Sequence, residues 1–302
     1  MKKVLKWTGI ILAGMIGVLI IGVVGLSIYA TVKYKPTYSD RPLYPITADT
    51  SPAGIARGAY LMEDAMSCTE ACHSFGGKRL AGGAETISEG PVRFVFAVPN
   101  LTPDQETGLG SWTDAEIARA IREGIDRDGV AMIAMPSYSY HALSDADAAA
   151  VVGYLRSLEP VRNEVPPIGG NIVAKIMLAL GLFGPDPVGE PITEARLNPE
   201  PGTIENGKYM VAIGECMGCH KQNLAGGALP LAAPEVVPAA NITPGGELAF
   251  WTVEDFIQAV RTGAHPGGRT LDSEMPRYQM TNDDLTDLFN YLMTLPALPM
   301  NQ

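Results

Sequence analysis

The sequence predicts an all-α protein in which two tandem helical domains follow one N-terminal transmembrane helix. Three observations support this prediction. A long uncharged stretch lies near the N-terminus, and the part of the chain from residue 52 onward contains two similar copies of one pattern. Helix-start motifs recur in both copies. The alternation of apolar and polar residues that is typical of a strand is confined to residues 93–98, so a sheet is improbable.

The N-terminal stretch, residues 7–30, holds 24 uncharged residues after three lysines. It is long enough to cross a bilayer as a helix, and it exceeds the apolar core of about 7–15 residues found in a cleaved signal sequence. We therefore expect residues 1–35 to remain as a membrane anchor; cleavage after Ala30 is the alternative. Lysines flank both ends, so the flanking charges orient the helix only weakly.

The segment that follows, residues 36–51, is rich in Pro, Thr and Asp and has no apolar period. It is typical of a tether that lets the rest of the protein move. Beyond the anchor, 17 basic residues face all 33 acidic ones, and the whole chain has a formal charge of −11. Such an acidic surface repels phosphates, so we expect no nucleic-acid partner.

The duplication relates residues 52–160 to residues 203–298, which we expect to form two similar domains. The matching segments are Gly58-Ala59-Tyr60 with Gly207-Lys208-Tyr209, Leu80-Ala81-Gly82-Gly83-Ala84 with Leu224-Ala225-Gly226-Gly227-Ala228, Asn100-Leu101-Thr102-Pro103 with Asn241-Ile242-Thr243-Pro244, Trp112-Thr113 with Trp251-Thr252, Met135-Pro136 with Met275-Pro276, and Tyr154-Leu155 with Tyr291-Leu292. A duplicated module is the simplest explanation.

Helix-capping motifs place the main helices of each copy. A Ser or Thr is followed three residues later by Asp or Glu at Thr113, Thr252, Ser144 and Thr281. The helices that the last two open should end near Leu158 and Leu295. One further helix should precede the cysteines of each copy, at residues 52–66 and 203–214.

The segment between the copies, residues 161–202, is dense in proline and cannot form one continuous helix or a central strand. Within it, residues 171–183 are apolar apart from Lys175 and too short to span a membrane. We expect this apolar part to pack against the two domains. A contact with a partner or with the membrane surface is the alternative.

The second copy contains Cys216-Met217-Gly218-Cys219-His220, a CxxCH motif. Two thiols at this spacing lie on one face of a helical turn, where they can add to the two vinyl groups of a haem, and the histidine that follows can ligate the iron. A zinc knuckle would need two further soft ligands, and a redox CxxC would need a βαβ context. The motif therefore predicts covalently attached haem.

The first copy contains Cys68 and Cys72 followed by His73, with one more residue between the thiols. A disulfide or two idle thiols would be the alternative for this motif alone, but its place in the repeat predicts a second haem c. Covalent haem attachment in bacteria takes place outside the cytoplasmic membrane. We therefore expect the N-terminus inside the cell, a single pass through the inner membrane, and both domains on the periplasmic side.

The second axial ligand of each iron is predicted to be a methionine. Met135 and Met275 occupy equivalent places, and each precedes a proline, which favours extended backbone that can direct a thioether at iron. The competing side chains have no counterpart in the other copy; they are Met132, Met280, His141 and His265.

Taken together, residues 52–298 resemble two tandem class I cytochrome c domains, and the pattern Asn-(Leu/Ile)-Thr-Pro, Trp-Thr, Arg-x-Gly, Met-Pro, Tyr-Leu is similar to that of cytochrome c subunits of bacterial membrane-bound dehydrogenases. The resemblance implies that the first and last helices of each domain cross, with Gly58 near Tyr154 and Gly207 near Tyr291. It also implies haem propionates near four residues: Trp112, Trp251, Thr102 and Thr243. Those subunits commonly carry three haems, whereas this chain has cysteines for two.

The expected function is single-electron transfer between a membrane-associated donor and a periplasmic acceptor, both redox proteins. If His and Met fill both axial positions of each iron, no open site remains for a substrate, so we do not expect an enzyme. The alternatives are a dihaem peroxidase, which needs an open or displaceable ligand, and a fixed cytochrome subunit of a larger respiratory, dehydrogenase or photosynthetic complex.

Overall fold

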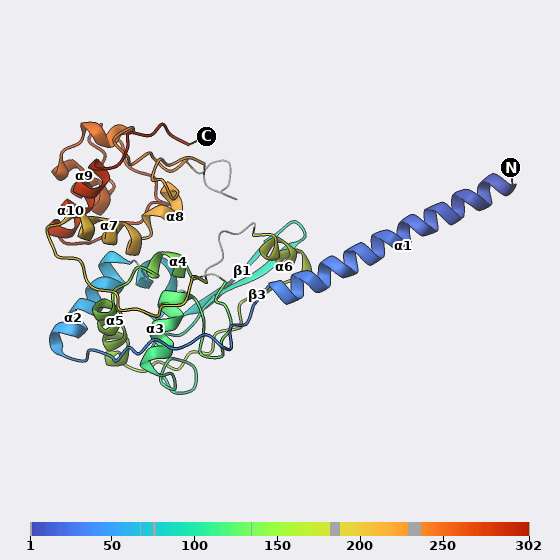
Figure 1. Ribbon diagram of the computed structural model, residues 1–302, viewed down its shortest axis with the longest axis horizontal. Helices are drawn as coiled ribbons and strands as arrows, with labels where there is room; N and C mark the ends of the chain where they lie inside the picture. The colour runs from blue at the N-terminus through green and yellow to red at the C-terminus, as the bar shows by residue number, and fades with distance from the viewer. Residues whose placement is uncertain are drawn as a thin grey trace.

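The computed structural model describes residues 2–66, 68–74, 77–133, 135–181, 188–228 and 237–301. Its N-terminal helix α1 (Lys2–Lys33) projects away from the rest of the protein (Figure 1). Residues 6–33 are long and apolar enough to cross a membrane, and no other described helix meets that test. Their apolar side chains are exposed to solvent along nearly the whole helix, as expected of a surface that lipid or a partner covers.

The segment at residues 36–51 does not form a free tether, and this expectation is wrong. It lies along the first domain, where the Tyr38 amide donates to the Gly129 carbonyl at 2.6 Å. Arg41 forms an ion pair of 3.1 Å with Glu123, whose side chain is 2% exposed. Composition could not reveal these contacts, because the groups that form them are mainly backbone amides whose partners lie far away in the sequence.

The first domain is built from helices α2 (Pro52–Tyr60), α3 (Asp114–Glu123), α4 (Ser137–Tyr140) and α5 (Asp145–Ser157) and from two π-helical turns, η1 (Leu61–Ala65) and η2 (Thr69–His73). The second contains α7 (Ile204–Ile213), α8 (Cys216–His220), η4 (Glu247–Phe250), α9 (Val253–Thr262) and α10 (Asn282–Met293). The helix expected at residues 52–66 is present as α2 continued by η1, and that expected at 203–214 is α7.

The predicted caps are present. Thr113 and Thr252 each accept a hydrogen bond from the amide of the acidic residue three positions later, whose side chain bonds back to the threonine amide. Ser144 and Thr281 open α5 and α10, where their hydroxyls accept hydrogen bonds from the amides of Asp147 and Asp284. The capped helices therefore begin where the sequence indicates.

The crossing of the first and last helices is confirmed in both domains. Helix α2 packs against α5, and α7 packs against α10. A Cβ atom added at Gly58 would lie 2.7 Å from Cβ of Tyr154, and one added at Gly207 would lie 2.8 Å from Cβ of Tyr291. Each glycine is required because any side chain would hold the two helices apart.

A three-stranded antiparallel sheet departs from the all-α expectation. Strand β1 (Gly83–Glu89) pairs with β2 (Val92–Val98) in a hairpin, with Gly83 opposite Val98, and β3 (Gly169–Gly170) pairs with β2. Only β2 matches the stretch in which alternation was recognised. The side chains of β1 after Gly83 are all exposed, so burial imposes no apolar period that sequence reading could detect.

The apolar part of the inter-domain segment forms helix α6 (Ile172–Ala179). This helix packs against α1 and against β2, which belongs to the first of the two domains that it was expected to contact (Figure 1). Phe183, at the end of that apolar stretch, lies outside the described residues. Farther along, the Asp145 amide donates to the Arg196 carbonyl at 2.8 Å, so the segment also binds the start of α5.

The two domains meet through a reciprocal pair of hydrogen bonds. The Tyr60 hydroxyl of the first domain donates to Asp284 of the second at 2.5 Å, and the Tyr209 hydroxyl of the second donates to Asp147 of the first at 2.7 Å. The tyrosines occupy equivalent positions in the repeat, as do the aspartates. The interface therefore joins like surfaces, as in a symmetric dimer, although both halves belong to one chain.

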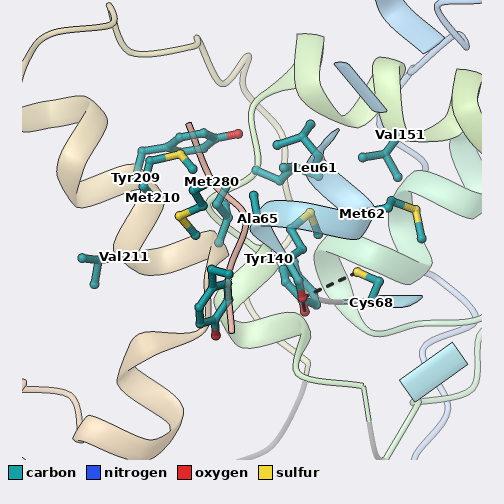
Figure 2. Close-up of a cluster of buried hydrophobic side chains, with 14 of the residues drawn as sticks. Leu61, Met62, Ala65, Cys68, Tyr140, Val151, Tyr209, Met210, Val211 and Met280 are labelled. Atoms are coloured by element: carbon teal, nitrogen blue, oxygen red, sulfur yellow. Dashed lines mark hydrogen bonds between the residues drawn. The ribbon is translucent and has the colours of Figure 1, made fainter. Parts of the chain in front are cut away.

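Apolar side chains fill the space beside these bonds. Figure 2 shows Leu61 and Ala65 of the first domain in one cluster with Tyr209, Met210 and Met280 of the second. All five are at most 8% exposed. The interface thus has a continuous hydrophobic core, and burial of this kind, at about 25 cal/mol per Å² of apolar surface, opposes separation of the domains.

Candidate haem-binding sites

The first motif adopts a π-helical turn. Cys68 precedes η2, which contains Cys72 and His73. A π-helix forms hydrogen bonds to the fifth residue instead of the fourth, so each turn takes up about one more residue than an α-helix does. The turn thereby accommodates the extra residue between the thiols. The longer spacing between Cys68 and Cys72 therefore fits the π-helical backbone of this motif.

The second motif forms the short helix α8, with Cys216 half-buried and Cys219 exposed. Glu215 directly before it has φ 58°, a left-handed conformation that turns the chain sharply from α7 into the motif. All four cysteines are free of disulfides. No group of three or more His, Cys, Asp or Glu side chains in the described part of the chain could hold a metal ion, so a zinc knuckle gains no support.

Both motif histidines have Nδ1 bonded to a backbone carbonyl and a lowered pKa. His73 Nδ1 donates to the Pro99 carbonyl at 3.2 Å, and His220 Nδ1 donates to the Ala240 carbonyl at 2.7 Å. Burial lowers the pKa of His73 to about 4 and also lowers the pKa of His220. Each imidazole is therefore neutral at pH 7, with Nε2 left as the free lone pair, which is the form that binds iron.

The loop after each motif has the same backbone structure. The amides of Gly82 and Gly226 donate to the carbonyl of the motif histidine in their own domain, at 3.1 and 3.0 Å. Leu80 and Leu224 adopt left-handed φ values of 57° and 58°, although they are not glycines, and both are buried. A rare conformation repeated at equivalent sites shows that the two halves hold their histidines by the same backbone arrangement.

The first domain contains two adjoining cavities, of about 70 and 350 Å³. His73 and Met135 line both, together with Trp112 and Met132. The smaller cavity is otherwise lined mainly by apolar side chains, among them Leu101, Leu109, Ile117, Ile121, Val151 and Leu155. A free imidazole nitrogen, two neighbouring thiols and an apolar hollow fit a covalently held haem. Met132 shares the wall with Met135, so the ligand role of Met135 stays a prediction.

In the second domain Met275 is half-buried against the hydrophobic core, and its competitors have other contacts. Met280 is 1% exposed and belongs to the inter-domain cluster of Figure 2. His265 Nε2 lies 2.7 Å from Glu247, and in the first domain His141 Nδ1 donates to the Arg122 carbonyl at 3.0 Å. The contacts of Met280 and His265 favour Met275, whose ligand role also stays a prediction.

The residues expected near haem propionates have differing surroundings. Trp112 lines the first cavity, and Trp251 packs edge-on against His265 with ring centroids 4.9 Å apart. Thr102 and Thr243 are buried, and their hydroxyls lie 2.8 Å from the side-chain oxygens of the asparagines two positions earlier. The proximity of all four residues to propionates stays a prediction.

Sequence reasoning missed two tyrosines that support the motifs. The Tyr140 hydroxyl donates to the Met66 carbonyl at 3.3 Å, and the Tyr278 hydroxyl donates to the Gly214 carbonyl at 2.7 Å. Each carbonyl lies two residues before the first cysteine of its motif. Tyr140 also hydrogen-bonds to Cys68, as Figure 2 shows. The only sequence clue is that each tyrosine follows a Met-Pro pair within a few residues.

A buried acid at the domain interface was also missed. Glu215 precedes the second motif, and its carboxylate accepts a hydrogen bond of 3.3 Å from the hydroxyl of Tyr138 in the first domain. Burial raises the pKa of Glu215 to about 7, against the weaker lowering effect of Tyr138. A single glutamate beside a cysteine carries no recognisable pattern, which is why the sequence did not reveal it.

The profile of the cytochrome c family matches residues 55–159 and 204–296, which contain both motifs. The chain belongs to the cytochrome c family. It is 30% identical over 288 residues to the alcohol dehydrogenase (quinone), cytochrome c subunit of Gluconacetobacter polyoxogenes, covering 85% of this chain and 59% of the relative. It is 28% identical over 281 residues to the gluconate 2-dehydrogenase cytochrome c subunit of Pantoea cypripedii, covering 82% of this chain and 61% of the relative.

A diheme cytochrome c-type protein of Cereibacter sphaeroides is 28% identical over 95% of this chain and 98% of its own length. By contrast, the chain spans about six tenths of the two dehydrogenase subunits. The family and this dihaem relative agree with the two motifs: the protein carries two covalently attached haem c groups and transfers electrons.

Proposed function

We propose that this cytochrome is a membrane-anchored dihaem electron carrier that passes single electrons between a membrane-associated donor and an acceptor on the periplasmic side of the inner membrane. The observation that carries the proposal is the contact of the segment that precedes the first motif with residues of the second domain, one of which lies two residues before the second motif. The Gln279 amide donates to the Asp64 carbonyl at 3.2 Å, and a Cβ on Gly214 would lie 3.6 Å from the Ala65 oxygen. Both motifs therefore adjoin one interface, across which an electron can pass within the protein.

Bound haem supplies the one-electron chemistry, and the chain supplies attachment, ligation and burial. The cysteines attach the group in each domain, and His73 and His220 offer Nε2 to iron. In our proposal Met135 and Met275 fill the opposite axial positions. With both positions filled, neither iron has room for a substrate, which disfavours the peroxidase alternative.

We further propose that residues 1–35 are retained and that the N-terminus lies inside the cell. Ala30 is fully buried, and α6 packs against α1. Cleavage after Ala30 would remove most of the helix against which α6 packs and expose its apolar residues to water. This packing supports an anchor over a cleaved signal, and haem attachment outside the cytoplasmic membrane sets the orientation.

The partner that we propose is a dehydrogenase. The two dehydrogenase relatives act on alcohol or gluconate by their names, so the substrate varies. Both relatives are cytochrome c subunits by their names, so the feature that they share with this chain is the cytochrome. The property that we extend to this chain is therefore electron transfer for an oxidoreductase, as a mobile carrier or as its cytochrome subunit.

A redox titration of the purified full-length protein, followed by visible and near-infrared spectra, tests the proposal. We expect two one-electron components, a methionine–iron band for each haem, and an intact mass that exceeds the polypeptide by two haems. Neither reduced haem should bind carbon monoxide. A mass increment of one haem, or ready binding of carbon monoxide, would contradict the carrier and reopen the peroxidase alternative.

A further inference from the structure

Helix α6 is attached to the base of α1. Ala30 on α1 and Ala174 on α6 are both fully buried, so small side chains allow close packing here. The Tyr34 hydroxyl, just beyond α1, donates to the Ile168 carbonyl at 3.1 Å. The Lys175 ammonium of α6 lies 5.2 Å from the centre of the Tyr34 ring. These contacts place α6 beside the last turns of α1.

The same turns lie at the expected surface of the bilayer. From Trp7 to Tyr29 the helix rises about 33 Å at 1.5 Å per residue, close to the bilayer hydrocarbon thickness of about 30 Å. Trp and Tyr are typical of both membrane–water interfaces, and Lys33 and Lys35 follow where headgroups begin. A helix packed near Tyr34 therefore lies at headgroup depth.

At that depth α6 leaves apolar side chains uncovered. Ile172 is 42% and Leu180 58% exposed, and Ile87 on the neighbouring hairpin is 44% exposed. Lys175 is the only charged residue of α6, and it lies over the Tyr34 ring. A helix in water normally presents a polar face, which α6 lacks.

We propose that α6 lies in the membrane surface, with its exposed apolar side chains in the boundary between lipid headgroups and acyl chains. The partner is the bilayer itself, because the unpartnered face continues the surface of a helix that spans it. Lys33 and Lys175 would then lie at the level of anionic headgroups. The inference rests on the proposed retention of α1 as an anchor.

The consequence is a fixed orientation of the haem domains. The segment at residues 36–51 is bound to the first domain, and α6 with the hairpin provides a second point of attachment beside α1 (Figure 1). Two attachment points restrict the tilt of the protein, whereas a free tether would not. The first domain would be held near the membrane surface.

Lipid photo-crosslinking of the full-length holoprotein tests this inference. The protein is placed in nanodiscs of phosphatidylcholine and phosphatidylglycerol that contain an acyl-chain diazirine, and the modified peptides are identified by mass spectrometry. We expect lipid adducts on α1 and on α6. Phe250 in the second domain, 89% exposed, is the matched apolar control and should remain unmodified.

The double variant Ile172→Glu, Leu180→Glu should reduce adducts on α6 roughly tenfold, because carboxylates are expelled from acyl chains, and leave those on α1 unchanged. Phe250→Glu should change neither. Adducts on α1 without adducts on α6 would overturn the inference and indicate that a protein covers this face. Absence of adducts on α1 as well would instead contradict the proposed anchor.

Discussion

In the first haem domain the motif cysteines are four residues apart, with Cys68 directly before a π-helical turn and Cys72 within it, whereas in the second they are three apart on an α-helix. The histidine that follows is nevertheless held alike in both, by a backbone carbonyl on Nδ1. One inserted residue is therefore absorbed locally by the wider turn. The comparison shows that the support of the motif histidine is maintained while the thiol spacing varies.

The two domains differ more in what surrounds them. Residues 36–51 and residues near Arg196 bind the first domain, which also contains the hairpin β1–β2. The second domain is joined to the first by the reciprocal Tyr–Asp bonds and the hydrophobic cluster. The position of the second domain thus depends on its contacts with the first. Paired substitutions at equivalent sites test how far the two are alike.

The largest effect is expected at the helix crossings. In Gly58→Ala the added Cβ would lie 2.1 Å from the Ala150 carbonyl oxygen, and in Gly207→Ala 2.0 Å from that of Asp287. Each variant should lose about 3 kcal/mol of unfolding free energy, since neither backbone can yield freely. Thermal melting followed at the haem bands measures this. Gly9→Ala, which has nothing within 4 Å, is the control, and equal melting temperatures would refute the close crossing.

The methionines that we propose as axial ligands come next. Met135→His and Met275→His should each lower the reduction potential of one haem by a sizeable part of the range of about 0.8 V that axial ligands span. The potential of the other haem should stay nearly unchanged. Potentiometric titration with optical detection checks this. Met132→Leu and Met280→Leu are the matched controls and should keep both potentials. If Met275→Ala leaves the near-infrared bands intact, the ligand assignment is wrong.

The reciprocal interface bonds should differ in strength because the two aspartates differ in burial. Tyr209→Phe leaves Asp147, which is 1% exposed, without one charge-assisted partner and should cost about 2 kcal/mol. Tyr60→Phe affects the half-buried Asp284 and should cost about 1 kcal/mol. Chemical denaturation measures both. A double-mutant cycle with Asp147→Asn isolates the pair, and a larger loss for Tyr60→Phe would contradict this ranking.

The last difference concerns pH and exists only in the second domain, since Ser67 occupies the equivalent sequence position in the first. The pKa of Glu215 is raised from 4.5 to about 7, so its protonated form favours folding. This stabilisation is complete below pH 4.5 and is lost as pH rises through 7. The free energy of unfolding should therefore fall by about 1.4 kcal/mol for each unit of pH within this range. Glu215→Gln should flatten the stability profile between pH 4.5 and 7; an unchanged profile would exclude Glu215 as its source.

Much of the architecture was predictable because its determinants are local. Capping residues such as Thr113 act within one helical turn, and the CxxCH motif spans five residues. The duplication added a further prediction, because it placed Gly58 and Gly207 at equivalent positions of the two domains. The family resemblance then predicted which helices these glycines approach, as the structure confirmed.

Other features depended on tertiary structure alone. The bound segment at residues 36–51, strand β1 and the Tyr60–Asp284 and Tyr209–Asp147 bonds join groups far apart in the sequence. Backbone amides look alike in every sequence, and an exposed strand carries no apolar period. The sequence by itself therefore determined the two haem motifs and their helices. Only folding, by bringing distant hydrogen-bonding groups and apolar faces together, decided how the two domains meet and how the first is held beside α1.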